Sequence, residues 1–466
     1  MSSGGKIRQR LKSGNITRLL TGRGPANDIE NTINIDKLLE HRVSVAVLPF
    51  TDRIGKSNQA HFCAGVAEEL LNTLARVPGL RVVPRVASCN FSSENDVVTS
   101  GAKLGADTLL GGWIMRTAGR LQLKAILYDT RNGREIWSQR FDRTVQDIME
   151  IQYVITTAVV RELGLAKEDA VSAVQLPVEP RAYDFFLRGL SYFSRHTTQD
   201  IVYARQMLKQ AIEIEPGYGR AWAGVAYTHG FEYMYFNASN VNLAEVRRTS
   251  AKALKLAPEL AQAHVASGIA NCMRHNYRKT EKEFAKAIQL DPGNFQAWYF
   301  FGRAKVHEGD TPRALKLFDC ASKVRPEDFQ SVLLQTQLYI SLGREDKAIE
   351  VTREGIKRAR AALAINPNDN RALNLGAFAL WRLGESAEAG RWMSRSLENA
   401  PMDSIIQYNG ACFYSLAGEV NQALDCLENC LIKVGNINRE WLEHDSDMDN
   451  IRGHPRYEEI ISNFPD

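Results

Sequence analysis

The residues of this chain that could carry chemistry are few and widely spaced. Gly55-Lys56-Ser57 follows an apolar stretch. A Gly-Lys-Ser segment in such a place is also found in phosphate-binding loops. Such a loop also needs a glycine five residues before Gly55, so that backbone N–H groups can surround the phosphates. Phe50 stands at that place. We therefore interpret the segment as an ordinary polar loop.

Cys426 and Cys430 are one helical turn apart and could share a metal ion. Their nearest histidine in sequence is His444, whereas zinc sites usually have four ligands in closer pairs. Both cysteines also have core-like spacing with Ala423 and Leu427, which favours packing. The sequence predicts no metal site.

No pattern of the remaining residues indicates catalysis. The nine histidines are scattered, and neither His-Glu-x-x-His nor Gly-x-Ser-x-Gly occurs. The adjacent Glu68 and Glu69 lie on a helix whose other face is apolar, so we expect both to be solvated. The prediction is a protein that is not an enzyme, with no catalytic residue and no cofactor.

Composition indicates two or three ordinary folded domains. The 466 residues are 44% hydrophobic and 24% charged, with a formal net charge of +4. This near balance does not indicate nucleic acid as a partner. The sequence contains no run of about 18 apolar residues, so it predicts no membrane span. The seven cysteines, an odd number and mostly within apolar helical patterns, favour a reduced, cytoplasmic environment.

Residues 1–42 form a basic leader. Its first 24 residues contain six basic side chains and no acid, and they lack the apolar stretch of a secretory signal. Binding to nucleic acid or anionic lipid stays open, but the leader is rich in Ser and Gly and lacks aromatic residues, which favours disorder. The basic residues are Lys6, Arg8, Arg10, Lys12, Arg18 and Arg23.

Six of the prolines between residues 216 and 401 recur with a nearly constant period. Their spacings are 42, 34, 34, 41 and 34 residues, and 34 is the period of the tetratricopeptide repeat. The two longer spacings indicate repeats with seven or eight additional residues. The prolines are Pro216, Pro258, Pro292, Pro326, Pro367 and Pro401.

Residues 295–328 resemble the tetratricopeptide repeat most clearly. Trp298 and Phe318 are the large apolar residues expected between two antiparallel helices, Gly302 is small where we expect the helix backbones to approach, and Gly309 falls in the turn. One such hairpin cannot bury its apolar face alone, so successive hairpins must stack. We predict about seven hairpins over residues 181–433, a carboxyl-terminal cap over 434–466 and a linker over 166–180.

Residues 43–165 predict an α/β domain. Strands are expected at 43–50, 80–86, 108–116, 121–129 and 135–142, and helices at 61–77, 97–104 and 146–163. The order β-α-β-α-β-β-β-α indicates a mixed sheet with helices packed on it. The expected fold class is thus an α/β domain followed by an all-α repeat solenoid.

This first domain resembles the TolB-like amino-terminal domain, which is related to FlgO. The resemblance rests on Val-Ala-Val-Leu-Pro-Phe at 45–50, Gly-Val-Ala-Glu-Glu-Leu at 65–70 and Val-Pro-Gly-Leu-Arg-Val at 77–82. It continues in Gly-Ala-Asp at 105–107 and Gly-Arg-Glu-Ile-Trp at 133–137. In bacteria this domain is often followed by tetratricopeptide repeats, as it is here.

The resemblance implies a signalling context. The pair of domains is commonly fused after an adenylate cyclase domain or a winged-helix DNA-binding domain. Only about 42 residues precede the first strand, too few for either domain. We therefore expect the regulatory half of such a system, with any output domain absent or on another chain.

The tetratricopeptide resemblance also implies a binding groove. In that family, positions two, five, nine, twelve and thirteen of each first helix line the concave face, where an extended or helical peptide binds. The arginines there would suit an acidic segment. The predicted function is a protein-binding scaffold in a bacterial regulatory complex; the alternative is the sensory part of a cyclase or transcription-factor system. The predicted groove residues are Gln262, Val265, Ile269, Gln296, Tyr299, Arg303, His307, Arg371, Asn374 and Arg382.

Overall fold

The computed structural model of this protein describes most of the chain from residue 43 onwards. The predictions for the leader 1–42, for the linker up to residue 178, for Gly55-Lys56 and for His444 lie outside the described residues. The described ranges are 43–53, 57–74, 77, 80–83, 96–117, 120–144, 147–165, 179–193, 198–235, 239–401, 403–431, 442–443 and 445–463.

The first domain contains one mixed sheet in the strand order β3-β1-β4-β5-β6, with β2 paired to β4. β1 is parallel to β3 and β4, whereas β5 is antiparallel to both of its neighbours. The expected mixed sheet is confirmed. The first predicted strand, 43–50, ends earlier than expected, at Val47, and the short β2 follows it as a separate strand at Thr51–Asp52. The strands are β1 (Val43–Val47), β2 (Thr51–Asp52), β3 (Leu80–Val83), β4 (Thr108–Thr117), β5 (Arg120–Asp129) and β6 (Glu135–Thr144).

Three helices pack on this sheet, two on one face and one on an end of the other. α4 (Ser57–Leu74) and α7 (Ile148–Glu162) pack on one face, over alternate strand residues such as Leu121 and Leu123. α6 (Val97–Leu104) packs on one end of the other face, against Leu109. Period-two alternation therefore separates two apolar clusters across the sheet.

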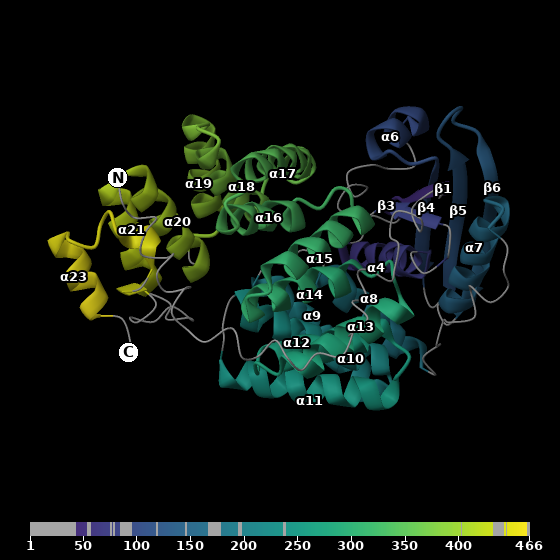
Figure 1. Ribbon diagram of the computed structural model, residues 1–466. Coiled ribbons are helices and arrows are strands. Elements are labelled where there is room, and N and C mark those ends of the chain that lie inside the picture. Colours follow the sequence, from purple (N-terminus) through teal and green to yellow (C-terminus); the bar gives the residue numbers. More distant parts are fainter. Residues whose placement is uncertain are drawn as a thin grey trace. The chain divides into compact units, whose positions relative to one another are not determined.

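Seven successive helix pairs follow within the described residues and form a tetratricopeptide-like helical solenoid (Figure 1). Each first helix packs on its own second helix and on the first helix of the next pair, except that contacts between α14 and α16 are sparse. The pairs are α8 (Pro180–Phe193) with α9 (Thr198–Ile214), α10 (Gly219–Tyr235) with α11 (Asn240–Leu256), α12 (Ala261–Cys272) with α13 (Tyr277–Leu290), α14 (Phe295–Glu308) with α15 (Thr311–Val324), α16 (Gln330–Ser341) with α17 (Glu345–Ile365), α18 (Asn370–Arg382) with α19 (Ser386–Asn399) and α20 (Ser404–Ala417) with α21 (Val420–Leu431), followed by η4 (Ser446–Met448) and α23 (Pro455–Ser462).

The periodic prolines mark a hydrogen bond that recurs from repeat to repeat. Trp298 Nε1 donates to the carbonyl oxygen of Pro292 at 2.9 Å, six residues earlier. Proline has no backbone N–H to donate, but its carbonyl oxygen can accept a hydrogen bond from a side chain in the first turn of the next helix. The same contact joins Trp222 to Pro216, His264 to Pro258 and Gln407 to Pro401.

The glycines inside α12 and α14 are small for a reason other than the expected close approach of two helix backbones. A methyl group on Gly302 would lie 2.8 Å from the Phe318 ring, and one on Gly268 would lie 2.9 Å from the Phe284 ring. The glycine thus makes room for an aromatic ring of the second helix, rather than for its backbone. Gly309 has a φ of 81°, as the turn requires.

The longer repeats contain longer helices. α17 has 21 residues, whereas α15 in the regular repeat has 14. α10 and α11 have 17 residues each. The additional residues described by the structure therefore extend helices rather than form separate elements.

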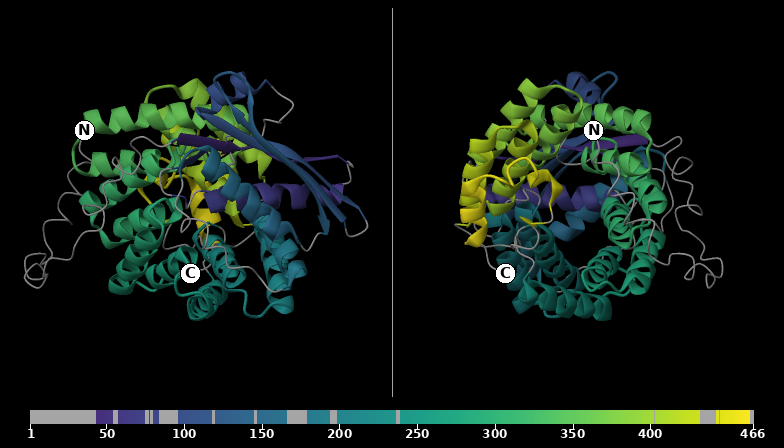
Figure 2. Two further views of the ribbon diagram at one scale, coloured as in Figure 1. Left: turned by 90° about the vertical axis from the view of Figure 1, so that its right-hand side faces the viewer. Right: turned by 60° about the vertical axis from the view of Figure 1, so that its left-hand side comes forward.

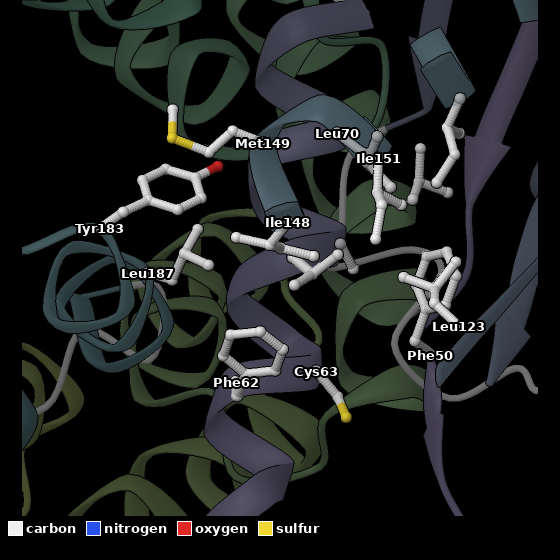
Figure 3. Close-up of a cluster of buried hydrophobic side chains, with 14 of the residues drawn as sticks. Phe50, Phe62, Cys63, Leu70, Leu123, Ile148, Met149, Ile151, Tyr183 and Leu187 are labelled. Carbon is white, nitrogen blue, oxygen red and sulfur yellow. The ribbon is translucent and has the colours of Figure 1, made fainter. Parts of the chain in front are cut away.

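One apolar core continues from the sheet into the first repeats. α4 lies between the sheet and α8 (Figures 1 and 2). Figure 3 shows Tyr183 and Leu187 of α8 beside Met149 and Ile148 of α7, in the same cluster as Phe62 of α4. Among the described residues, none of the helices is both long enough and apolar enough to cross a membrane.

Candidate functional site

The predicted groove residues lie on three first helices and differ in exposure. Val265 and Ile269 of α12, Tyr299 of α14 and Asn374 of α18 are buried. Four other residues are partly buried, and His307 and Arg382 are exposed. The partly buried residues are Gln262, Gln296, Arg303 and Arg371. The prediction that these ten residues bind a partner is not tested by their placement.

The buried members of this set pack between repeats. The Tyr299 ring stacks on Phe295 with a centroid distance of 5.4 Å, and its hydroxyl lies 3.4 Å from Gln330 Oε1 of the next repeat. Arg303 faces His307 on the same helix. Desolvation of the imidazole, together with the Arg303 charge, lowers the pKa of His307. This part of the face is therefore neutral at His307 and cationic at Arg303.

Arg371 and Arg382 have different surroundings. The Arg371 guanidinium carbon lies 5.4 Å from the ring centroid of Phe231 in α10. This distance permits a cation–π interaction between helices far apart in sequence. Arg382, at the end of α18, is close enough to Asp447 for its charge to act on that carboxyl group.

A cavity of about 440 Å³ opens beside α18 and α20. Three of its residues, Phe378, Tyr408 and Cys412, occupy positions five or nine of their first helices. The cavity therefore lies on the face that the repeat pattern assigns to binding. We call it the end pocket, and its lining residues are Phe378, Tyr408, Asn409, Cys412, Asp445, Ser446 and Asp447.

Asp445 fixes the carboxyl-terminal segment against α20. Its carboxylate accepts a hydrogen bond from the Asp447 backbone N–H at 2.9 Å, and so caps η4. The Tyr408 hydroxyl also donates to this carboxylate, and the Cys412 thiol lies 3.8 Å from it. On the other side of the pocket, Asn409 Nδ2 donates to Asn374 Oδ1 at 3.0 Å.

Asp447 differs from Asp445 because its carboxylate lacks a partner. In the part of the chain that the structure describes, no hydrogen bond or ion pair reaches it. Burial and the neighbouring Asp445 raise the pKa of Asp447, while Arg382 opposes that shift. A half-buried carboxylate in this state gains stability when a cation or a hydrogen-bond donor enters the pocket.

Cys412, Asp445 and Asp447 also bring one sulfur and two carboxylate oxygens within 4.8 Å of one another. Burial and the Asp445 charge raise the pKa of the Cys412 thiol well above its usual range, so the thiol is protonated at neutral pH. Metal ligation requires the thiolate. The observed hydrogen bonds to Asp445 favour a hydrogen-bonded cluster over a metal site.

Cys426 and Cys430 are both buried in α21. The Cys430 thiol lies 3.5 Å from the Ser404 carbonyl oxygen. Burial raises the pKa of Cys426 to about 12 and that of Cys63 to about 12. These environments are typical of inert core cysteines.

We expect the cysteines of the folded protein to resist alkylation. At pH 8, iodoacetamide should modify Cys63 and Cys426 at least about tenfold more slowly than in the unfolded chain, because the thiolate fraction falls tenfold for each unit of pKa. Mass spectrometry of peptides from folded and urea-unfolded samples measures this ratio. Equal rates in the two samples would contradict the burial described here.

Sequence reasoning named none of the residues that line the end pocket. Two predicted groove residues only neighbour it: Asn374 accepts a hydrogen bond from Asn409, and the charge of Arg382 acts on Asp447. Tyr408 and Cys412 could have been found by applying the same positions to the last repeat. Residues 445–447 belong to no repeat, so no periodic signal places them there.

The fold and the end pocket together define a tetratricopeptide-like repeat protein that carries a small mixed α/β domain. No family model matches the chain. It is 30% identical over 192 residues to a Rhizobium meliloti (strain 1021) protein named Putative adenylate cyclase 3, covering 40% of this chain and 33% of that protein. It is 26% identical over 166 residues to Superkiller protein 3 of Schizosaccharomyces pombe, covering 36% of this chain and 12% of that protein.

Solved structures show a similar arrangement at low sequence identity. One is the APC/C hetero-tetramer Cut9-Hcn1, with a TM-score of 0.47 and 12% identity, covering 88% of this chain and 73% of that chain. Another is the human IFIT1 dimer with m7Gppp-AAAA, with a TM-score of 0.48 and 13% identity, covering 66% of this chain and 75% of that chain. The chain spans a third or less of the length of the curated relatives it matches.

Proposed function

We propose that this protein is a non-enzymatic scaffold that binds a partner polypeptide on the first-helix face of its repeats. We further propose that it acts in a cytoplasmic regulatory complex of a bacterium. The observation that carries the proposal is the end pocket, a cavity on the binding positions of two successive repeats with an unpartnered carboxylate inside it. Stacked helical repeats present such extended faces to protein ligands.

The chemistry of the end pocket favours a basic side chain of the partner. Phe378 offers an aromatic surface and Asp447 offers a carboxylate, and a guanidinium or ammonium group interacts well with both. An acidic partner segment was the expectation from Arg303, Arg371 and Arg382. At this end of the face, however, Asp445 and Asp447 line the pocket and only the nearby Arg382 opposes them, so the lining carries more negative than positive charge.

The variant Asp447→Asn is expected to weaken partner binding by at least about tenfold, because it removes the charge-assisted contact. Affinity capture from the native cell identifies the partner, and titration of the purified partner into wild-type and variant protein measures the change. Phe378→Leu should weaken binding as well. Asp319→Asn, on the exposed surface of α15, is the matched control and should bind like the wild type.

If Asp447→Asn and Asp319→Asn bind the partner equally well, the end pocket is not the partner site. A partner that is lost only when Arg303 or Arg371 is replaced would instead place binding at the centre of the face.

A second candidate function is the regulatory part of an adenylate cyclase system. It is favoured by the 192-residue match to the protein named Putative adenylate cyclase 3 and by the TolB-like resemblance of the first domain. Recovery of a cyclase or a DNA-binding regulator as the captured partner would support this candidate. Recovery of an unrelated protein in stoichiometric amount would favour the general scaffold.

A further inference from the structure

One half of the sheet's second face is not covered by any described helix. α6 packs on the end of this face near Leu109 and Tyr128. Beyond it, alternate residues of three neighbouring strands form a cross-strand row, in which Trp113 of β4 pairs with Lys124 of β5, and Lys124 pairs with Arg140 of β6. Side chains that are paired in this way lie on the same face, one strand apart.

This row brings positive charges together, and Asp142, the acid whose charge interacts with Arg140, is shared with other partners. Lys124 lies directly opposite Arg140, and like charges in that arrangement are destabilising. Asp142, the acid in the next row, already accepts hydrogen bonds from Arg120 at 2.7 Å and from Gln122 at 3.1 Å. In the described part of the chain, no ion pair forms at Lys124.

Arg53 adds a third cation from the other side. Its guanidinium carbon lies 4.4 Å from the Trp113 ring centroid, and that of Arg140 lies 5.5 Å from the same ring. Arg53 has no ion pair among the described residues. We call Arg53, Lys124 and Arg140 around Trp113 the cationic row. It extends from the end of β2 across β4, β5 and β6, whose spacing is about 4.8 Å from strand to strand.

We propose that the cationic row binds single-stranded nucleic acid across the open face of the sheet. The three cations would contact successive phosphates, and Trp113 would stack on a base once its arginines turn to the backbone. An acidic peptide would satisfy the charges but would give the Trp113 ring no role. The proposal does not depend on the groove of the repeats. The near-neutral charge of the whole chain does not reveal the cationic row, because only the register of the strands brings these residues together.

The test uses the full chain and a fluorescein-labelled dT15 oligonucleotide, with binding followed by anisotropy between about 50 and 200 mM salt. Three phosphate contacts predict a slope of log affinity against log salt of about −2. Lys124→Gln and Arg140→Gln should each reduce the slope by about 0.7 and weaken binding at low salt by about fivefold. Trp113→Leu should weaken binding by about fivefold or more, with little change in slope.

Arg143→Gln is the matched control. Arg143 is also on β6, but side chains alternate along a strand, so it lies on the opposite face of the sheet, with Phe141. This variant should bind dT15 like the wild type. Equal losses for Arg143→Gln and Arg140→Gln would overturn the proposal, as would wild-type protein that fails to bind dT15 at the lowest salt. Tighter binding of a fluorescein-labelled glutamate 15-mer than of dT15 would also overturn it, in favour of an acidic polypeptide.

Discussion

Replacing Arg220 by methionine is expected to lower the free energy of unfolding by about 3–5 kcal/mol, because it leaves a buried glutamate without its counter-charge. Arg220 Nη1 lies 2.7 Å from Glu69 Oε1, and Arg220 Nη2 lies 2.7 Å from Glu69 Oε2. The Glu69 side chain is 4% exposed and the Arg220 side chain is 10% exposed. This two-pronged pair joins α4 of the first domain to α10 of the repeats.

The surroundings of this pair explain why its loss is costly. Burial would lower the pKa of Arg220, but the Glu69 charge raises it above its usual value, so the arginine is charged at every accessible pH. Tyr183 and Tyr218 enclose the pair, and burial raises the pKa of both hydroxyl groups. Neither phenol can supply the positive charge that a lone Glu69 would need.

Urea unfolding of the wild type and of three variants measures the effect. The double variant Glu69→Leu/Arg220→Met should recover most of the loss, because an apolar pair needs no counter-charge. Arg360→Met is the matched control: its partners Glu385 and Glu388 are partly exposed, and the cost should stay below about 1 kcal/mol. If Arg220→Met costs no more than Arg360→Met, the pair does not stabilise the junction.

The same pair shows where sequence reasoning about this fold ends. The apolar stripe of α4 was visible as Val66, Leu70 and Leu74, and the 34-residue period located the repeats. The prediction that Glu69 is solvated is wrong: it is 3% exposed. Helical periodicity assigns one buried stripe, whereas α4 is buried on two sides, by the sheet and by α8. The partner that makes its burial tolerable is 151 residues away.

The candidate sites divide in a similar way. Repeat positions select residues such as Asn374 and Arg382 as groove candidates, because every repeat has the same geometry. They do not distinguish a residue that packs on the next repeat, such as Tyr299, from one that lines a cavity. The end pocket depends on Asp447 from outside the array, and the cationic row depends on the register of β5 with β6. Neither long-range arrangement follows from local spacing.

The largest loss expected within the repeats follows from Trp298→Ala, about 3–5 kcal/mol in the free energy of unfolding. Trp298 is completely buried, and its indole N–H donates to the Pro292 carbonyl. The substitution leaves both a cavity and an unsatisfied carbonyl. Because each repeat contacts mainly its neighbours, hydrogen exchange should accelerate from α12 to α16 and stay slow in β4 and β5.

Trp222 provides the matched control, because it occupies the same repeat position and donates the same hydrogen bond, to Pro216 at 3.0 Å. Its ring is only partly buried and is stacked with Arg248, at 5.6 Å from the guanidinium carbon. Trp222→Ala removes an equivalent hydrogen bond but less buried apolar area, so we expect about half the loss of Trp298→Ala or less. Equal losses would mean that the bond to the proline carbonyl, rather than burial of the ring, determines stability at this position. The repeating proline would then act chiefly as a hydrogen-bond acceptor, and the size of the position-four side chain would be secondary.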